Sequence, residues 1–104
     1  MYYRLYTGKD KKTHLEQFHP PDSMPATAVV FRNQPLGTFI DWHTAPRKQF
    51  LVTLEGEVEI GTGDGLLHVL GPGDMMLAED LTGQGHTTRV VGNKARISVA
   101  IPVE

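Results

Sequence analysis

The sequence predicts an all-β protein folded as an antiparallel sandwich or barrel. Glycine (11) and proline (7) are plentiful among the 104 residues, which is typical of a compact protein with many turns. Short runs rich in β-branched and aromatic residues recur at close intervals between these turns. No stretch places apolar residues at i, i+3, i+4 and i+7 over a useful length, so nothing indicates an amphipathic helix.

Composition limits the function classes. A chain of 104 residues suits one domain, here residues 1–104. The formal net charge of -2 gives no electrostatic attraction to nucleic acid or to an anionic membrane. The chain has no cysteine, which excludes disulfides, thiolate metal sites and cysteine nucleophiles.

No targeting or membrane segment is visible. The first residues, 1–5, are not followed by the apolar core of a signal peptide. No apolar run reaches the length needed to span a bilayer. We therefore expect a cytoplasmic protein.

The first half of the chain predicts strands over residues 2–6, 28–32, 37–43 and 49–54, with another short strand or a single turn over 14–18. Three prolines between residues 19 and 25 predict a surface loop, because proline lacks the backbone donor that a central strand needs. Residues 50–54 are almost all apolar, which indicates a strand covered on both faces.

The second half predicts strands over residues 57–60, 66–70, 75–78, 86–91 and 95–103. Asp64-Gly65 favours a tight hairpin turn between the first two, because both residues tolerate positive φ. Residues 79–85 form a polar loop punctuated by glycine.

Two sequence motifs resemble those of the cupin superfamily. The first motif is a glycine frame holding two histidines and a glutamate, and its positions fall here on Gly37, His43, Ala45, Gln49 and Gly56. The second motif opens at Gly73-Asp74 and ends at residues 83–86, Gly-Gln-Gly-His, after a loop about two residues longer than usual. The resemblance covers residues 35–92 and is closest to a group of small single-domain bacterial cupins, most of them uncharacterised.

This resemblance implies a jelly-roll-like β-barrel, or double-sheet sandwich, with a pocket lined by the inner faces of the strands. Such proteins are commonly homodimers. They include dioxygenases, isomerases, epimerases, lyases and decarboxylases as well as sensors and storage proteins, so the fold does not give the function.

The resemblance also implies a metal site, although two of the usual ligand positions hold other residues in this sequence. Cupins that bind metal generally supply three histidines and a carboxylate. His43 and His86 match two of the histidines, whereas Ala45 replaces the third and Gln49 replaces the carboxylate. The implied set for one divalent transition metal (Fe, Mn, Ni or Zn) is therefore His43, Gln49 and His86, which falls short of a structural zinc site.

Acidic residues near these positions are candidate replacements. Asp41 lies two residues before His43, and residues two apart in a strand share a face. It could fix the tautomer of His43 or act as a substitute ligand. Glu79 and Asp80, in the loop before His86, are alternative donors.

Three functions follow from this reading. The first is a small-molecule-binding cupin, which as an enzyme would use the metal or His43 or His86 as a general base. The second is a non-enzymatic sensor or accessory protein that binds a metabolite in a degenerate pocket. A third is a structural dimer with no ligand.

The remaining notable residues are expected at the surface. Trp42 and Phe50 alternate with His43 and Gln49, so they should point away from the pocket and need cover, which predicts a homodimer. Arg89, three residues after His86, should point to the opposite face of its strand and so lie on the outer surface or pair with an acidic residue. Surface positions are also expected for His14, His19 and His68.

Overall fold

The computed structural model describes all 104 residues as ten strands without a helix. The strands are β1 (Tyr2–Thr7), β2 (Thr13–Gln17), β3 (Val30–Gln34), β4 (Phe39–His43), β5 (Gln49–Glu55), β6 (Glu57–Gly61), β7 (Leu67–Leu70), β8 (Met75–Ala78), β9 (His86–Val91) and β10 (Arg96–Pro102). With no helix present, none is long and apolar enough to cross a membrane.

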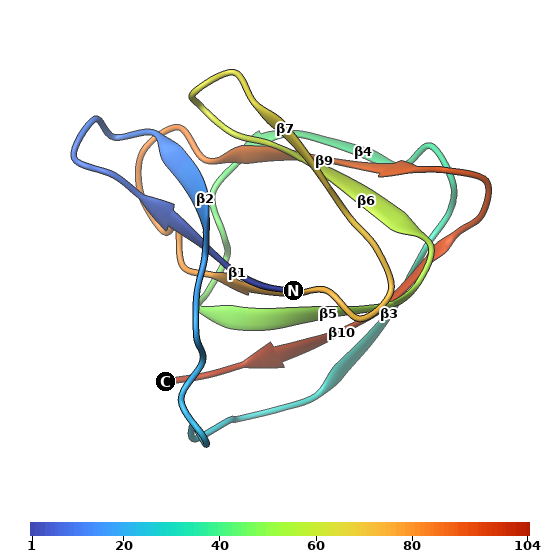
Figure 1. The fold of residues 1–104 in the computed structure, drawn as a ribbon, viewed down its shortest axis with the longest axis horizontal. Coiled ribbons are helices and arrows are strands. Elements are labelled where there is room, and N and C mark those ends of the chain that lie inside the picture. Colours follow the sequence, from blue (N-terminus) through green and yellow to red (C-terminus); the bar gives the residue numbers. More distant parts are fainter.

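The strands form two facing sheets. One has six strands in the order β2-β1-β8-β5-β10-β3, and the other has four in the order β4-β9-β6-β7. In Figure 1, β4, β9 and β6 run across the upper part of the view and β5 and β10 across the lower part. All pairs are antiparallel except β1 with β8, which is parallel.

The structure confirms the all-β, double-sheet architecture and most of the expected strands. Residues 13–17 form a strand rather than a single turn, because β2 pairs along the whole of β1. The expected strand 28–32 is displaced. It begins at Val30 and continues to Gln34, because this segment pairs with β10 from Ala100 to Arg96.

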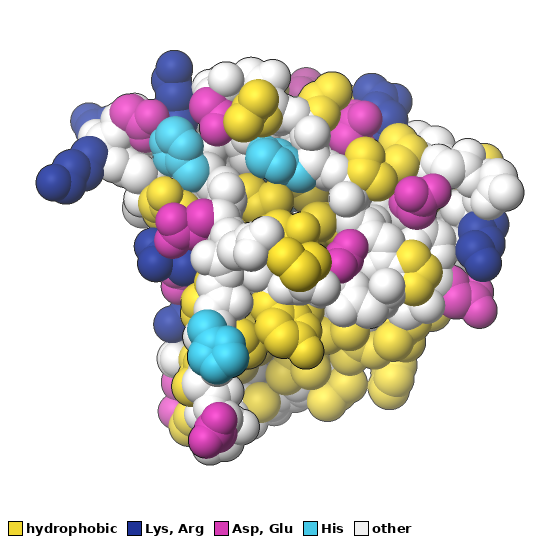
Figure 2. Space-filling view, viewed as in Figure 1, with side chains coloured by type: hydrophobic (Ala, Val, Ile, Leu, Met, Phe, Trp, Pro, Cys, Tyr) yellow, Lys and Arg dark blue, Asp and Glu magenta, His cyan; other side chains and the backbone are white.

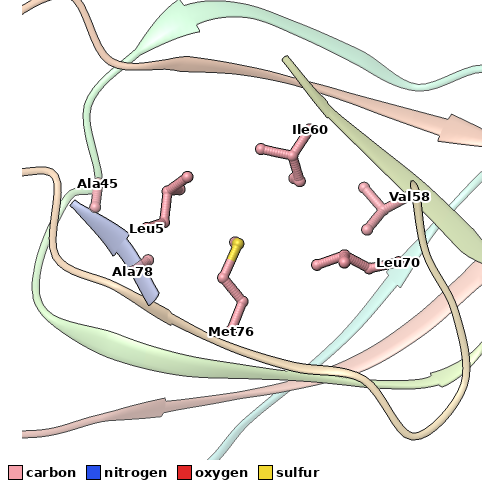
Figure 3. Packing of buried hydrophobic residues seen from close by; sticks show 7 residues of the cluster. All are labelled: Leu5, Ala45, Val58, Ile60, Leu70, Met76 and Ala78. Atoms are coloured by element: carbon pink, nitrogen blue, oxygen red, sulfur yellow. The ribbon is translucent and has the colours of Figure 1, made fainter. Parts of the chain in front are cut away.

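A small apolar core joins the two sheets (Figure 3). Met76 of β8 points from the six-stranded sheet toward the opposite sheet, where Val58 and Ile60 of β6 lie. Leu5 and Leu70 complete the larger side chains of this cluster, and both are buried. Because each such side chain contributes about 1.5–3 kcal/mol when buried, this cluster is a main source of the attraction between the sheets.

Much of the interior is polar. As many polar or charged residues are buried as hydrophobic ones, although polar side chains are mostly exposed in folded proteins. They are Thr13, Gln34, Gln49, Thr53, Thr62, Asp80, His86, Thr88, Arg96 and Ser98. Several of these surround one cavity, so the polar interior points to a binding site.

Candidate ligand-binding site

A cavity of about 160 Å³ lies between the two sheets, beside the apolar core. Its walls combine histidine, arginine and amide groups with apolar side chains, and they include no carboxylate. The lining residues are Arg32, Gln34, Ile40, His43, Ala45, Pro46, Gln49, Leu51, Ile60, Met76, Ala78, His86, Thr88 and Arg96. All three residues of the expected site, His43, Gln49 and His86, are therefore at one cavity.

A β-bulge turns His43 into the cavity. The pairing of β4 with β9 shifts register between Ile40 and His43, and both of these residues line the cavity although they are three positions apart. A bulge inserts an extra residue and so breaks the strict alternation of a strand. The Nδ1 atom of His43 lies 2.7 Å from the carbonyl oxygen of Asp41. A carbonyl can only accept, so Nδ1 carries the proton.

Asp41 does not have the position that alternation predicts. It is exposed and is absent from the cavity lining, because the bulge separates its side chain from that of His43. Its carboxylate instead accepts a hydrogen bond from the backbone N–H of Trp42 at 2.9 Å. Only its backbone carbonyl contacts the His43 ring.

The carboxylate that serves the site belongs to Asp80. Its side chain is completely buried, and its Oδ2 lies 2.6 Å from Nδ1 of His86. The same oxygen accepts a hydrogen bond from the hydroxyl of Thr13 at 2.9 Å. A carboxylate held this way fixes the proton of His86 on Nδ1, as carboxylates do for histidines that bind metal or move protons.

The two imidazoles form a close pair. Their ring centres are 4.3 Å apart and their planes are tilted by 54°. His43 and His86 are direct partners in the β4–β9 ladder. Since each Nδ1 is bonded to a protein oxygen, Nε2 is the nitrogen that each ring can offer to a ligand. In the neutral form, each Nε2 carries a free lone pair.

Gly85 makes this close approach possible. Its φ is +81°, and a Cβ added there would lie 2.0 Å from the carbonyl oxygen of His43. Glycine avoids both the strain and the collision. The backbone before β9 can therefore run directly against the end of β4.

A buried arginine lies toward the other end of the cavity. Arg96 is 4% exposed and bonds only neutral groups: the side-chain oxygen of Gln34 at 3.2 Å and the hydroxyl of Thr53 at 3.1 and 3.3 Å. Burial lowers the pKa of its guanidinium to about 10, and the nearby charge of Arg32 adds to the lowering. Arg96 is still a cation at neutral pH.

The other expected surface residues are placed largely as predicted. Arg89 is exposed and stacks its guanidinium 4.3 Å from the ring centre of Phe39. His19 is exposed. His14 is half-buried and pairs with Asp10 at 2.9 Å, while His68 is half-buried and lies 3.1 Å from the hydroxyl of Thr62. Glu79 is an ion-pair partner of Arg4, at 2.7 Å, and not a cavity residue.

Neither a protein-family model nor a curated protein matches the sequence, whereas solved structures do. An uncharacterized conserved protein with a double-stranded β-helix domain from Klebsiella pneumoniae matches with a TM-score of 0.58 and 22% identity, over 82% of this chain and 81% of that one. An RmlC-like cupin from Desulfovibrio desulfuricans matches with a TM-score of 0.52 and 18% identity, over 96% and 79%. The chain has a cupin fold.

A protein in an Fe(II) form is also among the similar structures. HppE, in its Fe(II) form with substrate bound, matches with a TM-score of 0.52 and 17% identity, over 81% of this chain and 55% of that one. At such identities the likeness concerns the fold alone.

The donor set at this cavity differs from that of a strong metal centre. Gln49 is buried, and its amide oxygen lies 3.5 Å from Nε of Arg47. Ala45, also buried, has no donor atom in its side chain. No group of three or more His, Cys, Asp or Glu side chains is arranged so that it could hold a metal ion. Two imidazole nitrogens and one amide oxygen, all neutral, fit only a divalent ion that prefers nitrogen.

Proposed function

We propose that this cupin binds a small molecule in its cavity, with the Nε2 atoms of His43 and His86 in contact with the ligand. One observation carries the proposal: both Nδ1 atoms are bonded to protein oxygens, which leaves two paired Nε2 lone pairs for the cavity. Histidines that only stabilised the core would use both ring nitrogens within the protein.

The two rings are not equivalent in what they can do. A proton accepted at Nε2 of His86 produces an imidazolium whose charge is balanced by the Asp80 carboxylate, 2.6 Å from Nδ1. The same change at His43 is balanced only by the dipole of the Asp41 carbonyl. His86 is therefore the better general base of the pair, and His43 is the better hydrogen-bonding or metal-binding partner.

A divalent metal is compatible with the same atoms. The residues that would hold it are His43, His86 and Gln49, and the two histidine rings are oriented by the Asp41 carbonyl and the Asp80 carboxylate. When bound, such an ion polarises a carbonyl or enol oxygen of a ligand. The neutral donor set favours Ni²⁺ or Zn²⁺ over Mn²⁺ or Fe²⁺, because imidazole suits the former better.

Metal binding is tested by titrating the metal-free protein with Ni²⁺, Zn²⁺ and Mn²⁺ under isothermal calorimetry. We expect Zn²⁺ or Ni²⁺ to bind at one site, and His86→Ala to weaken that binding by about 10- to 100-fold or more. The half-buried His68 supplies the control, because His68→Ala removes an imidazole outside the cavity. Metal content that stays substoichiometric and is unchanged in His43→Ala would eliminate the metalloenzyme version.

A non-enzymatic metabolite-binding sensor or accessory protein is the second candidate. It is favoured by Ala45 and Gln49, which stand where metal-binding cupins have a histidine and a carboxylate. A small molecule that raises the melting temperature without being converted, followed by NMR of the ligand over hours, supports this candidate. Conversion that stops in His86→Ala supports the enzyme.

We also propose that the protein is a homodimer, and the outer face of the six-stranded sheet supports this. Strand β10 directs its small or charged residues inward and its large aliphatic ones, Ile97, Val99 and Ile101, outward. On the neighbouring edge strand, Phe31 is 81% exposed. Figure 2 shows hydrophobic side chains gathered along the lower side of the molecule, where these strands lie. Exposed apolar patches of this kind mark interfaces.

Trp42 and Phe50 lie on different sheets, and the face proposed here is that of the six-stranded sheet, which does not include Trp42. Light scattering at micromolar protein is expected to give twice the chain mass of 11.5 kDa, and Phe31→Asp to give the monomer. Trp42→Asp, which places the same charge on the four-stranded sheet, is expected to leave the dimer intact. A monomeric mass for the unaltered protein contradicts the prediction.

A further inference from the structure

We infer that the cavity binds its ligand through a carboxylate held by Arg96, with Arg32 as a second cation at the rim. This inference rests on the proposed function and names the chemical class of the ligand. The His43–His86 pair would contact the remainder of the same molecule.

The hydrogen bonds of Arg96 leave donors free for a ligand. A guanidinium has five N–H donors, and Arg96 uses three of them, one on each nitrogen, toward Thr53 and Gln34. The two that remain belong to the two terminal nitrogens. These are the atoms that form the bidentate fork with a carboxylate.

Nothing in the protein neutralises this cation. Arg96 is 4% exposed and has no ion pair with any carboxylate, whereas buried charges are normally paired. A second cation lies on the adjacent strand. Gln34 of β3 is the pairing partner of Arg96, and Arg32 lies two residues before Gln34 on the same face of that strand. Both Arg32 and Gln34 line the cavity. With two arginines and no acidic residue in the lining, the cavity favours an anion.

The cavity also sets the size and orientation of the ligand. Its volume of about 160 Å³ is below the ~300 Å³ at which pockets for larger ligands begin, so a narrow, unbranched acid that extends along the cavity fits best. Gln49 and Thr53 both face inward from β5 and are four residues apart, which is about 13 Å along the strand. The histidine end and the arginine end are therefore opposite ends of one cavity.

A short carboxylate and its uncharged amide provide the test. Propanoate, propanamide and inorganic phosphate are each titrated into the full-length protein, and binding is followed by NMR of the arginine and histidine side chains. We expect propanoate to bind and to shift the Arg96 signals, and propanamide to bind at least tenfold more weakly.

Variants locate the anion. Arg96→Met is expected to reduce propanoate affinity at least tenfold, and Arg32→Met about threefold, because Arg32 is exposed and its charge is screened by solvent. Arg89→Met is the matched control, since Arg89 is on the outer surface against Phe39, and it should leave binding unchanged. Arg96→Lys keeps the positive charge but loses the two parallel N–H donors of the guanidinium. This variant replaces Arg96→Met in the test if Arg96→Met does not fold.

The outcomes separate this inference from the proposed function. Equal binding of acid and amide, insensitive to Arg96→Met, overturns the carboxylate assignment and leaves the cavity as a ligand site. If phosphate binds and propanoate does not, the group that Arg96 holds is an anion other than a carboxylate, and the carboxylate assignment is overturned. Failure of every probe to bind, with no change at Arg96, overturns the carboxylate assignment, whereas the proposed function is tested separately by the metal titration and by the ligand that raises the melting temperature.

Discussion

Replacing Asp80 with alanine is expected to lower the free energy of unfolding by about 3 kcal/mol, because it leaves two buried donors without an acceptor. Those donors are Nδ1–H of His86 and the hydroxyl of Thr13, which share one carboxylate oxygen of Asp80. A loss of this size is a large part of the stability of a small domain. Urea denaturation measures it, and ring ¹⁵N NMR shows whether His86 loses its single tautomer.

Asp41→Ala is the control for this prediction. Asp41 is the acid that strand alternation places beside His43, yet its exposed carboxylate bonds only the backbone of Trp42. Substitution there should change stability by at most about 0.5 kcal/mol, as for other surface positions, and should leave both imidazoles unaltered. If the two variants have equal effects, Asp80 does not hold the site as described.

Gly85→Ala should cost roughly 3 kcal/mol or more and should also disturb the histidine pair. The residue has a φ of +81°, and the new Cβ would be 2.0 Å from the carbonyl oxygen of His43, a backbone atom that cannot turn aside. Left-handed strain accounts for about 1–2 kcal/mol, and relief of the collision adds about 1–3 kcal/mol. Thermal unfolding gives the loss, and the His43 and His86 NMR signals report the displacement.

Gly65→Ala separates the two contributions. Gly65 has nearly the same backbone conformation, with φ at +84°, but an added Cβ there meets nothing within 4 Å. Only the strain of about 1–2 kcal/mol is expected. Equal losses at the two glycines would mean that the approach of Gly85 to β4 is looser than the structure shows.

The fold was predictable because its signals are local. Glycine and proline turns separate short β-rich runs, and each run became a strand within a few residues of its expected bounds. The displaced strand is informative. Asn33 and Gln34 have the composition of a turn, but they pair with Ile97 and Arg96 far along the chain. Tertiary pairing overrode the local preference there.

Parts of the site were predictable and parts were not. The glycine frame placed His43, Gln49 and His86 at one cavity. Asp80 was expected only as an alternative metal donor, whereas its carboxylate bonds Nδ1 of His86 and does not line the cavity. The expected position of the Asp41 side chain was wrong because a bulge has no clear sequence signature in a single chain. Asp41 does fix the tautomer of His43, but through its backbone carbonyl.

Arg96 was missed because β10 inverts the usual pattern. Large aliphatic residues normally identify the inner face of a strand, and in β10 they lie on the outer one. The signal that could have found Arg96 lies on the inner face of β10. There the small residues Ser98 and Ala100 alternate with the aliphatic ones and leave room beside Arg96. Small residues flanking a charged one in a strand indicate space for a ligand or for a long side chain.

The parallel pairing of β1 with β8 has a consequence for how the protein folds. Tyr2 is the partner of Met75, and at the other end of this ladder the N–H of Glu79 donates to the carbonyl of Leu5. Loop-closure entropy must be overcome before such distant contacts stabilise the chain, so folding should be slow for a domain of this size. The residues just after that ladder lead to Asp80. The histidine pair should therefore gain its orienting carboxylate late, and partly folded chains should hold the ring of His86 without a fixed tautomer.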